Sequence, residues 1–478
     1  MHAFITHGRR TSRSATARTA ALALGLVSLA ACSNITDPLL DAEDPDIIAP
    51  ENIDSPAGAV ALYRGALGRL NNIAAAEEST WLFGGLLADE YGTSSTFVQN
   101  DEVDLRRVQT NNSRVTPMYR RLNQVRTAAN QGLTAYGKWH ADSSTTIAEL
   151  YFARGFAEMQ LAQDFCGAIP LSNGADETVA LAGPSTTAEV FTRAVASYDS
   201  ALALVGTSTV ARGVSVARAA RIGKARALLG LGQFAAAGAL VTPALVPTTY
   251  SYDETFVLTS GDNEIWAQVP SARRYLVGDS IEGNARNIIV RNNLPFFSAR
   301  DPRVLANFTV TNGGRDTTRS QDGSTLSRTT LLYGRSTTIS IVNGLDARLV
   351  EAEAALQANN PGQMLTILNA LRSAGLKVGD VQLTATSLPP LTLPATREAQ
   401  VDLLFREKAF WTFSRGQRLG DLRRLIRQYG RTQDNVFPTG PHYRGSTYGT
   451  DVNFAVPNAE RNNPNVPQTG ESCINRDA

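Results

Sequence analysis

The feature that most constrains this chain is a helical period that recurs in four segments, with small residues at the turns. The segments are 147–165, 187–205, 219–241 and 346–372. Within them, apolar residues recur three or four positions apart and therefore share one face of a helix. We expect Gly232 to end a helix in the third segment and Pro361 to begin one in the fourth, which are positions that glycine and proline favour. Helix pairs with this spacing resemble tetratricopeptide units, in which small residues let two helices approach closely.

Long segments of a different character separate these helix pairs, so the chain is not a regular solenoid. Residues 243–345 mix turns with short β-like runs such as "EIWAQV" and "NIIVRNN", and residues 429–478 are rich in Pro, Asn and Gly. We predict a mostly α fold, an α–α superhelix with tetratricopeptide-like helix pairs over about 57–242 and 346–428. The two loop-rich insertions would lie over this helical body, and such loops commonly carry binding function. Trp266, within "EIWAQV", alternates with residues expected to be buried, so we assign it to the core.

The N-terminus has the layout of a lipoprotein export signal. Four arginines lie within residues 9–18, about twelve apolar residues follow, and the run ends in Leu-Ala-Ala-Cys at Cys32. An apolar run of this length is too short to cross a bilayer, which takes about 20 residues. The ending resembles the bacterial lipobox, so we predict a signal peptide over 1–31, a lipidated Cys32 that opens a flexible linker over 32–56, and one domain over 57–478. An ordinary signal peptide with an incidental cysteine is the alternative.

The charge balance excludes one class of partner. Removal of the signal peptide changes the formal net charge from +1 to −3, because that segment holds four arginines and no acid. A slightly acidic protein without a basic block offers little electrostatic attraction for nucleic acid, so we expect no nucleic-acid partner.

The residue patterns of common catalytic and metal sites are missing from the sequence. Of the four histidines, only His140 and His442 lie outside the signal peptide, and neither belongs to a metal-binding pattern. The sequence has no CxxC, no GxSxG and no phosphate-binding glycine loop. We therefore predict no catalytic residue, no metal and no cofactor. One alternative stays open: Asp89 and Glu90, with Trp81 and Tyr91 nearby in the sequence, could form the carboxylate pair of a glycosidase, whereas the simpler interpretation is two exposed acids after a helix.

Two residue pairs have a structural interpretation. Cys166 and Cys473 are the cysteines left once Cys32 is lipidated, and an even number in an exported protein is compatible with a disulfide. Two separate buried thiols are the alternative. Arg418 and Asp421 lie three residues apart on an expected helix, so we predict an ion pair within that helix rather than an anion site.

Four segments together resemble the SusD/RagB family. "LYFARGFAEMQLAQDFCGAIPLS" is similar to a family helix that runs into a Pro-Leu loop, and "LVEAEAALQANNPGQMLTILNALRSAGL" is similar to an Ala-rich helix pair. "LLFREKAFWTFSRGQRLGDLRRL" resembles the family's C-terminal helix, and "FAVPNAERNNPNVPQTG" resembles its closing tail. The third segment matches the pattern at Glu407, Gly416, Arg418, Asp421, Leu422 and Arg424. Arg415 stands where the family has a glutamate, so the resemblance is to a divergent branch.

This resemblance implies a SusD-like fold and an outer-membrane lipoprotein exposed at the cell surface, without enzymatic activity. Such proteins bind oligosaccharides or peptides, and we favour a glycan. They pair with a SusC-like TonB-dependent outer-membrane transporter, with the helical repeats against the transporter and the loop-rich side toward the ligand. A surface-anchored α-helical glycoside hydrolase and a tetratricopeptide-type assembly scaffold are the alternative functions.

Aromatic and polar residues in the loops are the candidates for ligand contact. Sugars are usually bound by the face of an aromatic ring and by hydrogen bonds to their hydroxyl groups. The candidates are Phe97, Tyr275, Phe296, Phe297, Arg273, Asn293 and Arg300. For each of them, an ordinary packing role is the alternative.

Overall fold

The protein is represented by a computed structural model that describes residues 53–174, 181–256, 261–282, 286–311 and 316–466. The predicted signal peptide, Cys32 and residues 32–52 of the linker lie outside the described residues, as does Cys473. The chain divides into two units, Met1–Ile53 and Asp54–Ala478. The helices and strands given below belong to the second unit.

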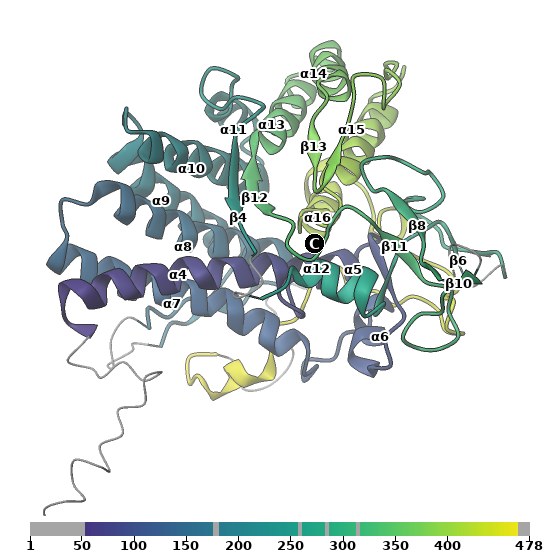
Figure 1. Cartoon of the computed structure of the whole chain (residues 1–478), viewed down its shortest axis with the longest axis horizontal. Helices are drawn as coiled ribbons and strands as arrows, with labels where there is room; N and C mark the ends of the chain where they lie inside the picture. The colour runs from purple at the N-terminus through teal and green to yellow at the C-terminus, as the bar shows by residue number, and fades with distance from the viewer. Residues whose placement is uncertain (1–52, 175–180, 257–260, 283–285, 312–315, 467–478) are drawn as a thin grey trace, which may run out of the picture. The chain divides into compact units, whose positions relative to one another are not determined.

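The first half of this unit is helical. Its helices are α4 (Pro56–Ala75), α5 (Thr80–Leu87), α6 (Val98–Asp104), α7 (Val115–Trp139), α8 (Ser144–Asp164), α9 (Thr187–Val205), α10 (Ala211–Gly230) and α11 (Phe234–Leu240). Helix α4 packs on α7, and α7 to α10 follow one another side by side (Figure 1). The four periodic segments found in the sequence therefore correspond to helices, and the mostly α fold is confirmed.

The last third contributes a second group of helices. These are α13 (Gly344–Gln357), α14 (Pro361–Ser373), α15 (Arg397–Trp411) and α16 (Arg418–Tyr429). Pro361 is the first residue of α14, as predicted. Helix α11 packs against α13, and α16 packs against α5 and α8, so the two helical groups form one body.

Small residues and capping explain how neighbouring helices pack. A Cβ at Gly223 of α10 would lie 2.4 Å from Cζ of Tyr198 in α9, so only glycine allows this contact. Helix α9 begins with a capping box, in which Thr186 and Glu189 satisfy each other's backbone N–H groups. Gly232 has a φ of +73° between α10 and α11, a left-handed conformation that glycine adopts without strain. The helix-turn-helix predicted there is confirmed.

Short antiparallel strand pairs occupy much of the region between the helical groups. The pairs are β1 (Tyr91–Thr93) with β5 (Tyr275–Val277), β2 (Ile169–Pro170) with β3 (Pro184–Ser185), β4 (Ser251–Glu254) with β12 (Ile339–Asn343), β6 (Ile281–Glu282) with β7 (Ile288–Ile289), β8 (Ala306–Phe308) with β11 (Arg328–Thr330), β9 (Val310–Thr311) with β10 (Asp316–Thr317) and β13 (Lys377–Val378) with β14 (Val381–Gln382). Strands β6, β8, β10 and β11 lie together at one end of the helical body, whereas β4 and β12 lie between its helices (Figure 1).

One of the two β-like runs is not a strand. "EIWAQV" forms the short helix α12 (Glu264–Trp266) followed by a π-helical turn, η1 (Ala267–Ser271). The side chain of Asn263 accepts hydrogen bonds from the N–H groups of Ile265 and Trp266 and so starts the helix. Trp266 packs against the core but is only half-buried, so its assignment to the core holds in part. "NIIVRNN" does contain a strand, β7.

Buried ion pairs link the helices, and two predictions about them are wrong. Asp89 and Glu90 are 2% and 0% exposed, so they are not the exposed acids that we expected, and no substrate reaches them as a glycosidase pair. Arg418 does not pair with Asp421; it donates two hydrogen bonds to Asp89, at 2.6 and 2.7 Å. Asp421 pairs instead with Lys408 at 2.8 Å.

The unusual Arg415 also has a partner in the core. It donates two hydrogen bonds to the carboxylate of Asp346, at 2.8 and 2.9 Å. The positive charge that replaces the family's glutamate is therefore neutralised by an acid in the first turn of α13.

Cys166 is fully buried and disulfide-bonded, and its backbone N–H donates to the carbonyl of Phe454 at 2.9 Å. Since Cys473 lies outside the described residues, the pairing of these two cysteines stays a prediction.

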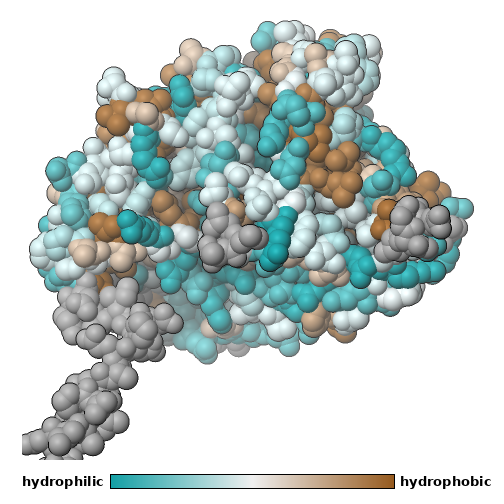
Figure 2. Space-filling model, viewed as in Figure 1, coloured by the Kyte–Doolittle hydropathy of each residue, from teal (hydrophilic) through white to brown (hydrophobic). Residues whose placement is uncertain are grey.

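The surface is mixed in character. Figure 2 shows hydrophilic and intermediate side chains over most of the visible face, with hydrophobic side chains in small separate patches. Within the described part of the chain, no helix combines the length and the apolar character needed to cross a bilayer.

Candidate functional site

Three of the predicted ligand contacts are packing residues. Tyr275, Phe296 and Phe297 are 1%, 0% and 6% exposed. Phe296 packs against Phe410 and Phe413 with ring centres 5.0 and 5.1 Å apart. These rings present no face to a ligand, because the short strands and turns around them turn their side chains into the core.

The other four candidates lie in loops but do not form one cluster by themselves. The half-buried Phe97 has the guanidinium groups of Arg114 and Arg274 at 4.2 and 5.5 Å from its ring centre. Asn293 donates to the carbonyl of Asp279 at 3.2 Å, and Arg300 donates to that of Ala306 at 3.2 Å. Their role as ligand contacts stays a prediction.

Arg273 is the candidate that touches a larger polar site. Its carbonyl accepts hydrogen bonds from the Ser94 hydroxyl at 2.9 Å and from the Gln321 N–H at 3.1 Å. These bonds join the loop after β1 to the loop before β5 and to the turn at 320–325. The pairing of β1 with β5 places the first two loops side by side.

A cavity of about 730 Å³ opens at this junction. It is lined by Arg286, Asp322, Ser324, Thr325, Tyr443, Arg444 and Gly445. We call it the Arg444 pocket. Its residues come from the loop-rich insertion and the C-terminal tail, which are the two regions that the sequence analysis associated with binding.

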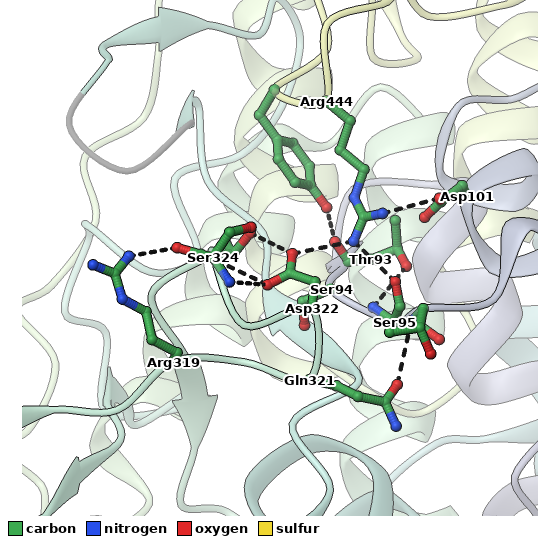
Figure 3. A network of polar contacts seen from close by, with 12 residues as sticks. Thr93, Ser94, Ser95, Asp101, Arg319, Gln321, Asp322, Ser324 and Arg444 are labelled. Atoms are coloured by element: carbon green, nitrogen blue, oxygen red, sulfur yellow. Dashed lines mark hydrogen bonds and ion pairs between the residues drawn. The ribbon is translucent and has the colours of Figure 1, made fainter.

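Arg444 connects the walls of the pocket. Its guanidinium donates to Asp101 at 3.0 Å, to Asp322 at 3.2 Å and to the carbonyl of Ser95 at 3.0 Å (Figure 3). Since these partners belong to α6, to the turn at 320–325 and to the loop after β1, one side chain fixes three segments relative to one another. A second link between two of them runs from the N–H of Asp322 to the carbonyl of Ser94, at 3.0 Å.

Asp322 is held by its own turn. Its carboxylate accepts the N–H groups of Ser324 and Thr325 at 2.9 and 2.8 Å and the Thr325 hydroxyl at 2.6 Å. Gly323 makes this turn with a φ of +69°. Burial alone would raise the pKa of Asp322, but these hydrogen bonds and the charge of Arg444 outweigh it and lower the pKa below its usual value.

Asp104 anchors the C-terminal tail beneath the pocket. Its Oδ2 accepts the N–H of Thr93 at 2.7 Å and the hydroxyl of Tyr443 at 3.2 Å, and it lies 3.1 Å from Nε2 of His442. The Tyr443 hydroxyl also donates to the carbonyl of Thr93. All these side chains are buried, so the tail residues that line the pocket rest on a fixed base.

Neither Arg444 nor Asp322 is among the residues predicted from the sequence, because those candidates were loop aromatics and the polar residues near them. The stretch Asp322-Gly323-Ser324-Thr325 carries a signal that could have been used, since an Asp followed by Gly and Ser/Thr favours a turn capped by its own carboxylate. For Arg444 there is no local signal, because its partners lie more than 100 residues away in the chain.

The fold is that of SusD superfamily proteins. A SusD-like carbohydrate-binding protein from Bacteroides fragilis matches with a TM-score of 0.62 at 13% identity, over 87% of this chain and 99% of that chain. A SusD superfamily protein from Bacteroides vulgatus gives 0.59 at 16% identity, over 86% and 98%. A second protein from B. vulgatus, described as a SusD-like carbohydrate-binding protein, gives 0.54 at 14% identity, over 77% and 83%.

Comparison by sequence, unlike comparison by structure, finds no match. No protein-family model matches the chain, and no curated protein matches it either. With identities this low, the structural matches show the fold, and the SusD-like fold that the sequence resemblance implied is confirmed.

Proposed function

We propose that this protein captures oligosaccharides in the Arg444 pocket at the cell surface and delivers them to a SusC-like TonB-dependent transporter, without cleaving them. The main observation that supports this proposal is the pocket itself. Loops from distant parts of the chain are joined by hydrogen bonds into a preformed polar cavity of about 730 Å³, a volume within the range of small-ligand sites.

The chemistry of the lining suits a sugar. Hydroxyl groups both donate and accept hydrogen bonds, and the pocket offers guanidinium, hydroxyl and backbone groups at fixed positions. Because Arg444 and Asp322 are already held in place, little conformational entropy is lost when a ligand binds. Two solved structures with this fold are described as carbohydrate-binding proteins, which supports a glycan over a peptide.

A binding titration tests the pocket. A glycan array selects ligands for the mature chain, and calorimetry then compares the wild type with Arg444→Leu. We expect the variant to lose binding, because the walls of the pocket lose the side chain that joins them. Arg431→Leu is the matched control, since Arg431 forms similar ion pairs with Glu398 and Asp402 at the end of α16. Equal binding by the wild type and Arg444→Leu would contradict the proposal, and so would release of shorter sugars from the bound ligand.

Two further experiments address location and partner. Metabolic labelling with palmitate should mark the wild type but not Cys32→Ala if Cys32 carries the lipid. Affinity purification from the membrane fraction should recover a TonB-dependent barrel protein together with the wild type. An unlabelled wild type, or purification without a barrel, would contradict the corresponding part of the proposal.

A further inference from the structure

A second cavity is separate from the Arg444 pocket, and we propose that it binds a small zwitterion of the α-amino acid type, with a carboxylate, an ammonium group and an apolar side chain. Its volume is about 400 Å³, within the range of small-ligand sites. Among the described residues, none lines both cavities. The proposal goes beyond oligosaccharide capture, because both the site and the ligand are different.

This cavity, which we call the Trp411 groove, is bounded by several elements. Its walls come from β4 and β12, which lie between the helices (Figure 1), from the start of α13, from the turn after α14 with β13, and from the end of α15. Leu345, Leu376 and Val378 supply an apolar part of the lining. The turn of the β13–β14 hairpin is fixed, because the N–H of Asp380 donates to the carbonyl of Leu332 at 2.7 Å. The groove therefore has a preformed wall that suits an apolar side chain.

Two buried N–H donors in the lining have no partner. Trp411 and Arg415 are 0% and 6% exposed, and neither the indole Nε1–H nor the guanidinium Nε–H has an acceptor among the described residues. The four Nη hydrogens of Arg415 are used, two by Asp346, one by the side chain of Asn343 and one by the carbonyl of Ser340. Both groups can only donate, and a buried donor left unpaired is unfavourable. A ligand carboxylate supplies the acceptors that they lack.

The lining also holds one charge of each sign that is not ion-paired. Lys377 and Asp253 are exposed residues of the groove, and within the described part of the chain neither has an oppositely charged group within 4.0 Å. The other three lysines of the chain each pair with an acid. The charge of Arg415 is matched by Asp346, so it adds no net charge. One unpaired cation and one unpaired anion match a zwitterion better than an ion of a single sign.

Ser340 places the acid and the donors close together. Its hydroxyl donates to Oδ1 of Asp253 at 2.7 Å, and its carbonyl accepts from Arg415 at 3.2 Å. The hydroxyl of Ser251 also donates to Oδ1, so Oδ2 of Asp253 is left for the ligand among the described groups. The short separation of the two charges in an α-amino acid suits this arrangement. We expect the ligand's carboxylate at Trp411, Arg415 and Lys377, and its ammonium group at Asp253.

The test uses amino acids with one charged group removed at a time. Leucine and phenylalanine are titrated into the mature protein beside their N-acetyl forms, which lack the ammonium group, and their amides, which lack the carboxylate. We expect the parent amino acid of at least one set to bind at least about tenfold more tightly than either derivative, the effect of one charge-assisted contact. Calorimetry measures the affinities.

A spectroscopic signal reports where the ligand binds. The chain has four tryptophans, and their indole N–H signals are resolved by NMR after labelling with ¹⁵N-tryptophan. The signal absent from Trp411→Phe is that of Trp411. We expect the amino acid to shift this signal, because its N–H gains an acceptor, and the amide derivative to leave it unchanged.

Two variants at exposed positions, which should fold normally, assign the charges. Lys377→Gln should weaken binding of the amino acid and its N-acetyl form several-fold without weakening that of the amide. Asp253→Asn should weaken binding of the amino acid and its amide without weakening that of the N-acetyl form. Lys138→Gln is the control: it removes an exposed lysine that pairs with Asp54 outside the groove, and it should change no affinity.

The outcomes separate this inference from the proposed function. No binding of either amino acid up to about 10 mM would overturn the groove as an amino-acid site. Equal affinities for the three forms, or binding that leaves the Trp411 signal in place, would do the same. None of these results affects capture of oligosaccharides in the Arg444 pocket, which is measured with Arg444→Leu. An oligosaccharide that displaces the amino acid from the groove would overturn the separation of the two sites.

Discussion

At the scale of single residues, Asp89 and Arg418 form an ion pair that is closed off from solvent. Their bonds are 2.6 and 2.7 Å long, and both side chains are at least nine-tenths buried. Removal of one partner leaves the other charge buried without compensation, which typically costs about 3–5 kcal/mol. We therefore expect Arg418→Met to lower the free energy of unfolding by that amount in urea titrations.

The matched control is Arg431→Met, which breaks ion pairs to the more exposed acids Glu398 and Asp402. Exposed pairs contribute about 0–1 kcal/mol, so this variant should stay near the wild type. Similar losses in the two variants would contradict the structural role assigned to the buried pair.

The buried Asp164 gives a prediction about pH. Burial raises the pKa of this carboxyl to about 7, against a usual value of 3.8, and the hydrogen bond from Gln160 and the charge of Arg423 offset this only in part. Between these two pKa values the unfolded chain has released the proton and the folded protein still holds it. The stabilisation from this group is therefore present below pH 4 and is lost as pH rises toward 7, by up to roughly 1.4 kcal/mol per pH unit.

Asp164→Asn removes the titration, so its stability relative to the wild type should increase between pH 5 and pH 7. Urea unfolding at several pH values measures this difference. Parallel pH profiles for the two proteins would show that Asp164 titrates normally in the fold.

Several predictions about single residues were wrong, and the reason is physical. Asp89 and Glu90 look like surface acids because nothing near them in the sequence neutralises them; the partner of Asp89 lies 329 residues away. Phe296 and Phe297 looked like loop aromatics because they lie in the loop-rich insertion. Only the packing of Phe296 against Phe410 of α15 and of Phe297 against Phe308 of β8 shows that they are core. Burial of this kind depends on contacts that a local pattern does not contain.

At the scale of elements, the contact between α9 and α10 depends on Gly223. An added Cβ would lie 2.4 Å from Tyr198, which is fully buried and has no room to move away. We expect Gly223→Ala to lower the free energy of unfolding by about 1–3 kcal/mol, as for other overpacked cores. Gly137→Ala in α7 is the control: nothing lies within 4 Å of its added Cβ, so it should be neutral or stabilising by up to about 1 kcal/mol. Thermal unfolding of the pair measures the contrast, and equal shifts would refute it.

Helices were easier to predict than strands. The helices at 187–205 and 361–373 show the helical spacing of apolar residues over several turns. They also have recognisable starts, at Thr186–Glu189 and Pro361, so local rules identify them. "EIWAQV" is too short for its alternation to distinguish a strand from a helix, and the capping residue Asn263 was the signal that would have decided it.

At the scale of the whole molecule, the sequence order of segments predicted the SusD-like fold but not the pocket. The fold follows from helix pairs separated by loop-rich insertions, which are features of composition and period. The pocket depends on how the loop after β1, the turn at 320–325 and the tail at 442–445 meet in space. No period or motif encodes that meeting. The residues that line the pocket do come from the insertion and the tail, the two regions in which binding loops were expected.

The most direct test of the central claim is a crystal structure of the mature protein with the tightest-binding oligosaccharide from the glycan array. We expect an intact sugar chain in the Arg444 pocket, with oxygen atoms within hydrogen-bond distance of Arg444 and Arg286. A ligand bound instead in the groove of about 400 Å³ beside Trp411 and Arg415, or against the surface of the helical body, would contradict it.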